Sequence, residues 1–218
     1  MLAYKFLDRQ GRTAIQAVQW PLPEGERPGP WVEAAAARPC REGIHACRPQ
    51  DLAYWIHHEL WEIELDGEVV EAERKIVARR GRLVRRFDEW ADGVLREFDD
   101  WCAWRARDYA VTVLDQTGHH QWAQRLREAG SLEDLAEVGH RAATALDDDS
   151  GPGSAAGLAG DVGLVAPTDL VAAPPFIAAC AAGHAATHES GTRHEFDRAY
   201  AGERAVQSDW VAGRLGLA

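Results

Sequence analysis

The clearest pattern of apolar and polar positions in the chain lies between residues 61 and 66. Three apolar residues alternate there with three acids: Trp61, Ile63 and Leu65 with Glu62, Glu64 and Asp66. A period of two places the two sets on opposite faces of a β-strand. Asp66-Gly67 is a turn signal. The pattern therefore predicts a core strand with one acidic face, ended by a turn.

Other segments of the first 86 residues also have the composition of strands. They are residues 2–7 and 14–20 on either side of a turn at 8–11, residues 31–34 as a strand or a helical turn, and residues 44–47. Residues 76–78 and 83–84 predict a hairpin or one long strand. Residues 21–30 contain four prolines and two glycines, which predicts a loop. A short helix is expected over 52–56, with Asp51 as its N-cap.

Helical periodicity begins after Phe87. Apolar and aromatic residues recur every three or four positions from Trp90 to Tyr109, which predicts one amphipathic helix from Asp88 to about Leu114. Four shorter helices are expected, at residues 120–129, 131–146 with Ser131 as N-cap, 176–189 and 193–215. Residues 147–163 are rich in glycine and aspartate, and this composition is typical of a linker.

These elements predict an α+β fold, in which an N-terminal and mainly antiparallel sheet is covered by C-terminal helices. The expected regions are a β-rich part at 1–86, a helical part packed on it at 87–146, a linker at 147–163 and a helical hairpin at 164–218.

Charge and composition narrow the classes of function. The 218 residues carry a formal net charge of −11, which argues against a protein that binds nucleic acid with its whole surface. No apolar run approaches the ~18 residues of a membrane span, and the first residues do not resemble a signal peptide. We therefore expect a cytoplasmic protein without a membrane partner, whose four cysteines are thiols, ligands or core residues.

Residues 74–86 depart from the acidic average, because they contain seven basic residues and no acid. Such a band can bind phosphate, bind an acidic partner or form ion pairs with the chain's own acids. We favour the last interpretation, since oppositely charged faces of one protein commonly neutralise each other.

The densest run of reactive side chains is Cys40–Gly67. His45 and Cys47 share one face of the predicted strand 44–47, where His45 is a ligand contact, a metal ligand or a core histidine. The candidate catalytic residues are His45, Glu62 and Glu64. The candidate ligand-binding residues are Cys47, Trp55, Arg79 and Arg82.

A second group of possible ligands recurs at every fourth residue of a predicted helix: Cys180, His184 and His188. Neither group completes the four ligands of a structural zinc site by sequence alone, so no bound metal is expected. The sequence does not identify a cofactor.

The first 86 residues resemble a family of small uncharacterised bacterial domains. Its signature is an aromatic N-terminal strand, then C-x-x-G-(I/F)-H-A-C, a helix and W-x-h-E-L-x-G, where h is apolar. These elements match Tyr4–Phe6, Cys40–Cys47, Leu52–Ile56 and Trp61–Gly67. The resemblance implies the fold and no activity. The Gly-Ile-His strand is also faintly similar to the split-sheet core of ADP-ribosyltransferase-like enzymes, whose catalytic triad cannot be assigned here.

These observations favour a small binding or interaction module with a ligand site around His45, for a small molecule or a protein. The alternative is an enzyme acting on a nucleotide-like substrate such as NAD, with residues 79–86 meeting phosphate. A cavity that joins His45 to Glu62 or Glu64 and to the basic band favours the enzyme. A filled core beneath His45 favours the module.

Overall fold

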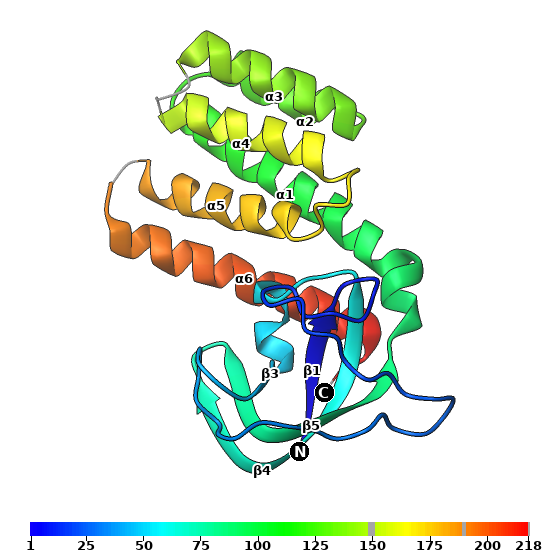
Figure 1. The fold of residues 1–218 in the computed structure, drawn as a ribbon. Helices are drawn as coiled ribbons and strands as arrows, with labels where there is room; N and C mark the ends of the chain where they lie inside the picture. The colour runs from blue at the N-terminus through cyan, green and yellow to red at the C-terminus, as the bar shows by residue number, and fades with distance from the viewer. Residues whose placement is uncertain (148–150, 189–190, 218) are drawn as a thin grey trace. The chain divides into compact units, whose positions relative to one another are not determined.

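The computed structural model describes residues 1–147, 151–188 and 191–217, and its architecture is α+β (Figure 1). An antiparallel sheet forms from the N-terminal part of the chain, and helices form from the C-terminal part. The chain divides into two compact units: a sheet unit, Met1–Leu95 with Ser208–Ala218, and a helical unit, Arg96–Gln207. The last turns of the C-terminal helix thus belong to the sheet unit, which differs from the predicted division.

Among the described residues, the sheet has five strands, β1 Leu2–Leu7, β2 Val32–Glu33, β3 Ile44–Ala46, β4 Glu59–Ala72 and β5 Lys75–Arg86. Their order is β1-β4-β5-β2, and β3 also pairs with β5; all pairs are antiparallel. The end of β3 returns to β1, where Tyr4 N donates to Cys47 O at 2.9 Å and Cys47 N to Tyr4 O at 2.8 Å. Strands β1, β4, β5 and β3 therefore form a ring that is closed by a single bridge.

The alternation in β4 is confirmed. Trp61, Ile63 and Leu65 are 6%, 0% and 2% exposed and belong to the core enclosed by the strands. The predicted turn at Asp66-Gly67 is wrong, because β4 continues to Ala72 through an irregularity between Asp66 and Val69. A positive φ of 77° at Gly67 accommodates this bulge. Residues 75–86 form one long strand, the second of the two predicted alternatives.

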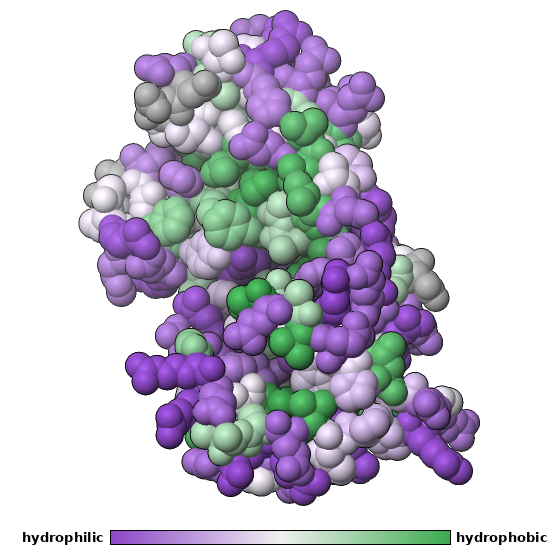
Figure 2. All heavy atoms as spheres, in the orientation of Figure 1, coloured by the Kyte–Doolittle hydropathy of each residue, from purple (hydrophilic) through white to green (hydrophobic). Residues whose placement is uncertain are grey.

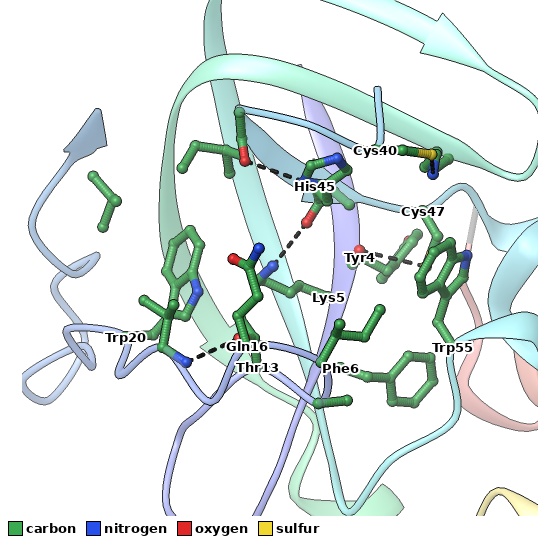
Figure 3. A pocket seen from close by; sticks show the side chains of 18 of the residues that line it. Tyr4, Lys5, Phe6, Thr13, Gln16, Trp20, Cys40, His45, Cys47 and Trp55 are labelled. Carbon is green, nitrogen blue, oxygen red and sulfur yellow. Dashed lines mark hydrogen bonds between the residues drawn. The ribbon is translucent and has the colours of Figure 1, made fainter. Parts of the chain in front are cut away.

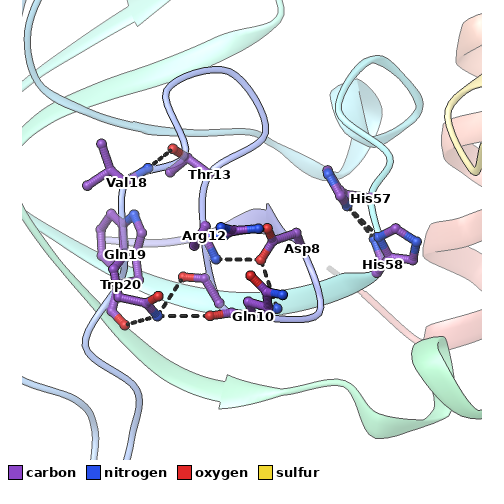
Figure 4. Close-up of polar contacts among 10 residues, drawn as sticks. Asp8, Gln10, Arg12, Thr13, Val18, Gln19, Trp20, His57 and His58 are labelled. Atoms are coloured by element: carbon purple, nitrogen blue, oxygen red, sulfur yellow. Dashed lines mark hydrogen bonds and ion pairs between the residues drawn. The ribbon is translucent and has the colours of Figure 1, made fainter.

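The strand predicted at residues 14–20 is a loop (Figure 4). Its base is held by Asp8, whose carboxylate accepts hydrogen bonds from Gln10 N and Arg12 N, each at 2.8 Å. The strand-like composition of this segment does not reflect burial, because Ile15 is 85% exposed. The loop nevertheless places Trp20 in the core, at 5% exposure.

Two helical details of the sheet unit also differ from the prediction. The short helix is a 3-10 helix, Pro49–Tyr54, and Asp51 lies inside it rather than at its N-cap; its carboxylate accepts from Arg48 Nε at 2.6 Å. The long helix expected from Asp88 contains a π-helical turn at Trp90–Val94 before α1 begins. Near the C-terminus, Ser208 Oγ accepts from Ala53 N at 3.0 Å.

Within the part of the chain that the structure describes, six α-helices follow: α1 Leu95–Gln116, α2 His120–Glu128, α3 Leu132–Leu146, α4 Gly151–Val165, α5 Ala173–Thr187 and α6 Arg193–Leu215. Ser131 caps α3 as predicted, since its Oγ accepts from Asp134 N at 3.1 Å. In the described ranges, no helix combines the length and apolar character needed to cross a membrane. On the face shown in Figure 2, apolar side chains gather over α4 and α5.

The linker predicted at 147–163 is wrong over most of its length, because α4 occupies Gly151–Val165; residues 148–150 lie outside the described residues. The glycines that suggested a linker allow α3 and α4 to approach backbone to backbone. A Cβ built at Gly139 would lie 2.4 Å from Gly160 N, and one at Gly163 would lie 2.6 Å from Leu132 O. Composition alone does not distinguish this packing from flexibility.

We expect Gly139→Ala to lower the free energy of unfolding by about 1–3 kcal/mol, because the added methyl group forces α3 and α4 apart. Gly157→Ala is the matched control. Its Cβ would lie 3.7 Å from Ala143 Cβ, an ordinary contact. That change should be neutral or add up to ~1 kcal/mol, because alanine favours a helix over glycine. Urea unfolding followed by circular dichroism compares the two, and equal effects would contradict the close approach.

Candidate functional site

A cavity of about 530 Å³ lies in the sheet unit, beside His45 (Figure 3). Its walls come from β1, the loop 13–20, the segment Cys40–Gly43 and β3, and Val32, Cys47, Trp55 and Lys75 complete the lining. Trp20 and Trp55 lie on opposite sides of the view in Figure 3, with Lys5 and His45 between them. The core beneath His45 is therefore not filled.

The cavity forms where β1 and β3 separate. Beyond the bridge between Tyr4 and Cys47, continued antiparallel pairing would bring a backbone N–H of β1 to the His45 carbonyl. Instead, the Lys5 side chain crosses the gap and its Nζ donates to His45 O at 2.8 Å. Gly43 makes the entry into β3 possible: its φ is 130°, and a Cβ there would lie 2.4 Å from Val77 Cγ1.

Lys5 is a buried amine, with 8% of its surface exposed. Its Nζ lies 4.7 Å from the centre of the Trp20 ring, on the ring face. Burial lowers the pKa of Lys5 to about 8, because the charged form loses hydration. Lys5 was not among the predicted site residues. One signal was available: Lys5 and Lys75 are the only lysines in the sequence, and both line the cavity.

The His45 ring is half-buried in the same wall. Its Nδ1 lies 3.1 Å from Gly43 O, an arrangement that fits a protonated Nδ1 donating to the carbonyl. Its Nε2 is buried and has no hydrogen-bond partner among the described residues. Burial lowers the pKa of His45, and the positive charges of Lys5 and Lys75 lower it further. A neutral ring with Nδ1 protonated leaves Nε2 as a hydrogen-bond acceptor.

The other candidate residues near His45 differ in whether their side chains are free to contact a ligand. Cys47 lines the cavity, but its thiol donates to Tyr4 O at 3.4 Å, and burial raises its pKa, so it is held as a neutral thiol. Trp55 also lines the cavity, and its Nε1 donates to Arg74 O at 2.7 Å. Cys40 is exposed and accepts from Lys75 Nζ at 2.8 Å.

Glu62, Glu64, Arg79 and Arg82 are not part of the cavity lining. The two glutamates pair across the outer face of the sheet, Glu62 with Arg85 at 3.2 Å and Glu64 with Arg82 at 2.7 Å. Arg80 continues this ladder with Asp66 at 3.1 Å. The basic band is thus largely neutralised by the chain's own acids, which confirms that interpretation. Lys75, the second residue of the band, reaches the cavity.

The helical cysteine and histidines are engaged in packing. The His184 ring meets Phe196 edge-on, with 5.4 Å between ring centres, and His188 Nδ1 lies 3.0 Å from Ala185 O. Burial raises the pKa of the Cys180 thiol. Across residues 1–147, 151–188 and 191–217, no three cysteine, histidine or acidic side chains are placed to hold a metal ion.

Comparison with known protein families, with curated proteins and with solved structures found no match. The resemblance of residues 1–86 to a family of small bacterial domains stays a prediction. The basis for assigning a function is therefore the chemistry of the cavity.

Proposed function

We propose that the sheet unit binds a small organic anion with an apolar or aromatic body in the cavity around His45. The observation that carries this proposal is the combination of a mostly apolar cavity of about 530 Å³ with both lysines of the chain in its walls. Sites for small molecules are typically concave, of roughly 300–1,000 Å³, and apolar apart from a few convergent polar groups.

The apolar walls suit a flat or aliphatic body. They come from β1, from the loop 13–20 and from the end of the 3-10 helix: Phe6, Ile15, Val18, Trp20 and Trp55. Ile15 and Val18 are 85% and 51% exposed, so a ligand that covers them removes apolar surface from water. Each Å² so covered contributes about 25 cal/mol.

The charges of the lining suit an anion. Lys5, Arg41 and Lys75 contribute cations, and Glu42 contributes a carboxylate. The described residues give Lys5 no salt bridge, so its buried ammonium lacks a counter-charge. A ligand carboxylate would supply one and would raise the pKa of Lys5 towards its ordinary value. The His45 ring lines the cavity, and a turn of the ring would expose its buried Nε2 as an acceptor for a ligand hydroxyl or amide.

A nucleotide-like substrate is the second candidate, because Lys75 connects the basic band to the cavity and the tryptophans offer faces on which a base can stack. Two features disfavour it. Glu62 and Glu64 lie outside the cavity, and the arginines Arg80, Arg82 and Arg85 are engaged with acids. ADP is therefore the appropriate comparator in a binding test.

We expect 4-methylbenzoate to stabilise the protein, with about 2.7 kcal/mol added at 100 times its dissociation constant. Lys5→Met should weaken this binding by roughly 10- to 100-fold, since a charge-assisted hydrogen bond is worth about 1.5–3 kcal/mol.

His45→Ala should also weaken the binding of ligands that carry a hydroxyl group, such as 4-(hydroxymethyl)benzoate, at little cost in melting temperature. Thermal shift and calorimetry measure both effects.

Arg79→Met is the matched control, because Arg79 is an exposed cation outside the cavity. It should leave the affinity for 4-methylbenzoate unchanged. Equal affinity in Lys5→Met and the unmodified protein would contradict the proposal. Tighter binding of ADP than of 4-methylbenzoate would favour the nucleotide alternative.

A further inference from the structure

We propose, building on this binding function, that Lys5 reacts covalently with its ligand. The cavity then accepts aldehydes or ketones that carry a carboxylate, and the ε-amine of Lys5 forms an imine with the carbonyl carbon. Lys5 is thereby a nucleophile, in addition to a cation that attracts the ligand.

The first argument for this inference is the distribution of lysine and arginine along the sequence. Two of the 24 basic residues are lysines, and both line the same cavity, while every basic side chain elsewhere is arginine. Arginine stays protonated in proteins, whereas a buried lysine can lose its proton and act as a nucleophile. The only two basic side chains of the sequence that can become neutral amines are therefore together at the cavity.

The surroundings of Lys5 keep its amine available. It is 8% exposed, its Nζ lies 4.7 Å from the centre of the Trp20 ring, and it donates a hydrogen bond to a neutral carbonyl, His45 O at 2.8 Å. No carboxylate among the described residues forms a salt bridge with it. Burial lowers the pKa of Lys5 to about 8. About a tenth of the molecules therefore carry a neutral amine at pH 7, against well under a thousandth for an ordinary lysine.

The reaction needs no oxidant or reductant. The lone pair of Lys5 Nζ attacks the carbonyl carbon, and one N–H proton moves to the former carbonyl oxygen, which gives a carbinolamine. The C–O bond then breaks with addition of a proton, water leaves, and the second N–H proton is released as the C=N bond forms. Amine and carbonyl compound thus become imine and water.

Lys75 differs from Lys5 in its exposure and in its contacts. It is partly exposed, its Nζ donates to Cys40 Sγ at 2.8 Å, and it lies on the face of the Trp55 ring at 5.8 Å. An ammonium at the rim of the cavity suits the carboxylate of a ligand whose carbonyl lies at Lys5. The two lysines therefore select a molecule that carries both groups, separated by a flat or aliphatic body.

The test uses 4-formylbenzoate with sodium cyanoborohydride, which reduces an imine to a stable secondary amine. Peptide mapping by mass spectrometry should find the reduced adduct on Lys5 at least tenfold more often than on Lys75. Excess 4-methylbenzoate, which has no aldehyde or ketone group to form an imine, should suppress it. The rate of labelling should rise as the pH increases through about 8, the pKa at which half of the Lys5 amine is neutral. Lys5→Arg keeps the cation and should abolish the adduct at this position.

Labelling that falls equally on Lys5 and Lys75, or mainly on Lys75, would overturn the inference. If 4-methylbenzoate binds and 4-formylbenzoate leaves no adduct on Lys5, imine formation is rejected and the binding function stands. If neither compound binds nor reacts, both proposals fall. The peptide map of the unmodified protein decides between these results even where Lys5→Arg does not fold.

Discussion

Replacement of Ile63 by alanine is expected to lower the free energy of unfolding by about 2–5 kcal/mol. Ile63 is 0% exposed and pairs with Ala3 of β1 on one side and Leu83 of β5 on the other. All three residues belong to the core enclosed by the strands. Removal of three carbon atoms from this position loses apolar burial and leaves a cavity that the surrounding strands cannot fill by moving.

Urea unfolding followed by tryptophan fluorescence measures this effect. The matched control is Ile15→Ala, the same change at a position that is 85% exposed, and it should alter stability by less than about 0.5 kcal/mol. A loss below about 0.5 kcal/mol for Ile63→Ala would show that β4 is not the centre of the core.

A second large effect is expected in the helical unit, where the buried carboxylate of Glu203 in α6 pairs with Arg105 of α1, whose side chain is 29% exposed. Arg105 Nε and Nη2 contact the two carboxylate oxygens at 2.6 and 2.5 Å, and the Tyr109 hydroxyl donates to the same carboxylate at 2.6 Å. Arg105→Met removes the counter-charge and leaves the carboxylate in the interior. We expect a loss of about 3–5 kcal/mol, the usual consequence of breaking a buried ion pair from one side.

A double-mutant cycle tests this explanation. Glu203→Leu together with Arg105→Met should recover much of the stability, because the stranded charge is gone. Arg193→Met is the control: Arg193 pairs with Asp197 at 2.9 Å, but the two side chains are 85% and 57% exposed. That change should cost at most about 0.5 kcal/mol. Additive losses for Arg105→Met and Glu203→Leu would mean that the two residues do not act as a pair.

Local signals predicted much of the fold. The alternation from Trp61 to Leu65 identified a core strand because burial on one face imposes a period of two. Ser131 identified the start of α3 because an N-cap is a contact between near neighbours. The bounds of α6, Arg193–Leu215, also agree with the prediction, since helical periodicity is a property of the segment itself.

The errors arose where partners distant in sequence decide the outcome. Residues 151–163 form a helix that packs closely on α3, with Gly139 of α3 facing Gly160 of α4. Residues 14–20 form a loop because hydrogen bonds at its base and the burial of Trp20 shape it. The cavity has the same origin. Lys5 and His45 are 40 residues apart, and their contact depends on where β1 and β3 separate. The signature at Cys40–Cys47 identified His45 as a candidate site residue, but it did not identify Lys5.

The most direct test of the binding site uses the two lysines themselves. Protein labelled with ¹³C and ¹⁵N in lysine alone should give signals from Lys5 and Lys75 only, so an NMR titration with 4-methylbenzoate reports on the cavity without interference. We predict that both sets of signals shift together and saturate with one affinity, and that the pKa of Lys5 rises from about 8 as the carboxylate binds. Lysine signals that stay unmoved while calorimetry detects binding would place the ligand elsewhere and contradict the assignment of this cavity.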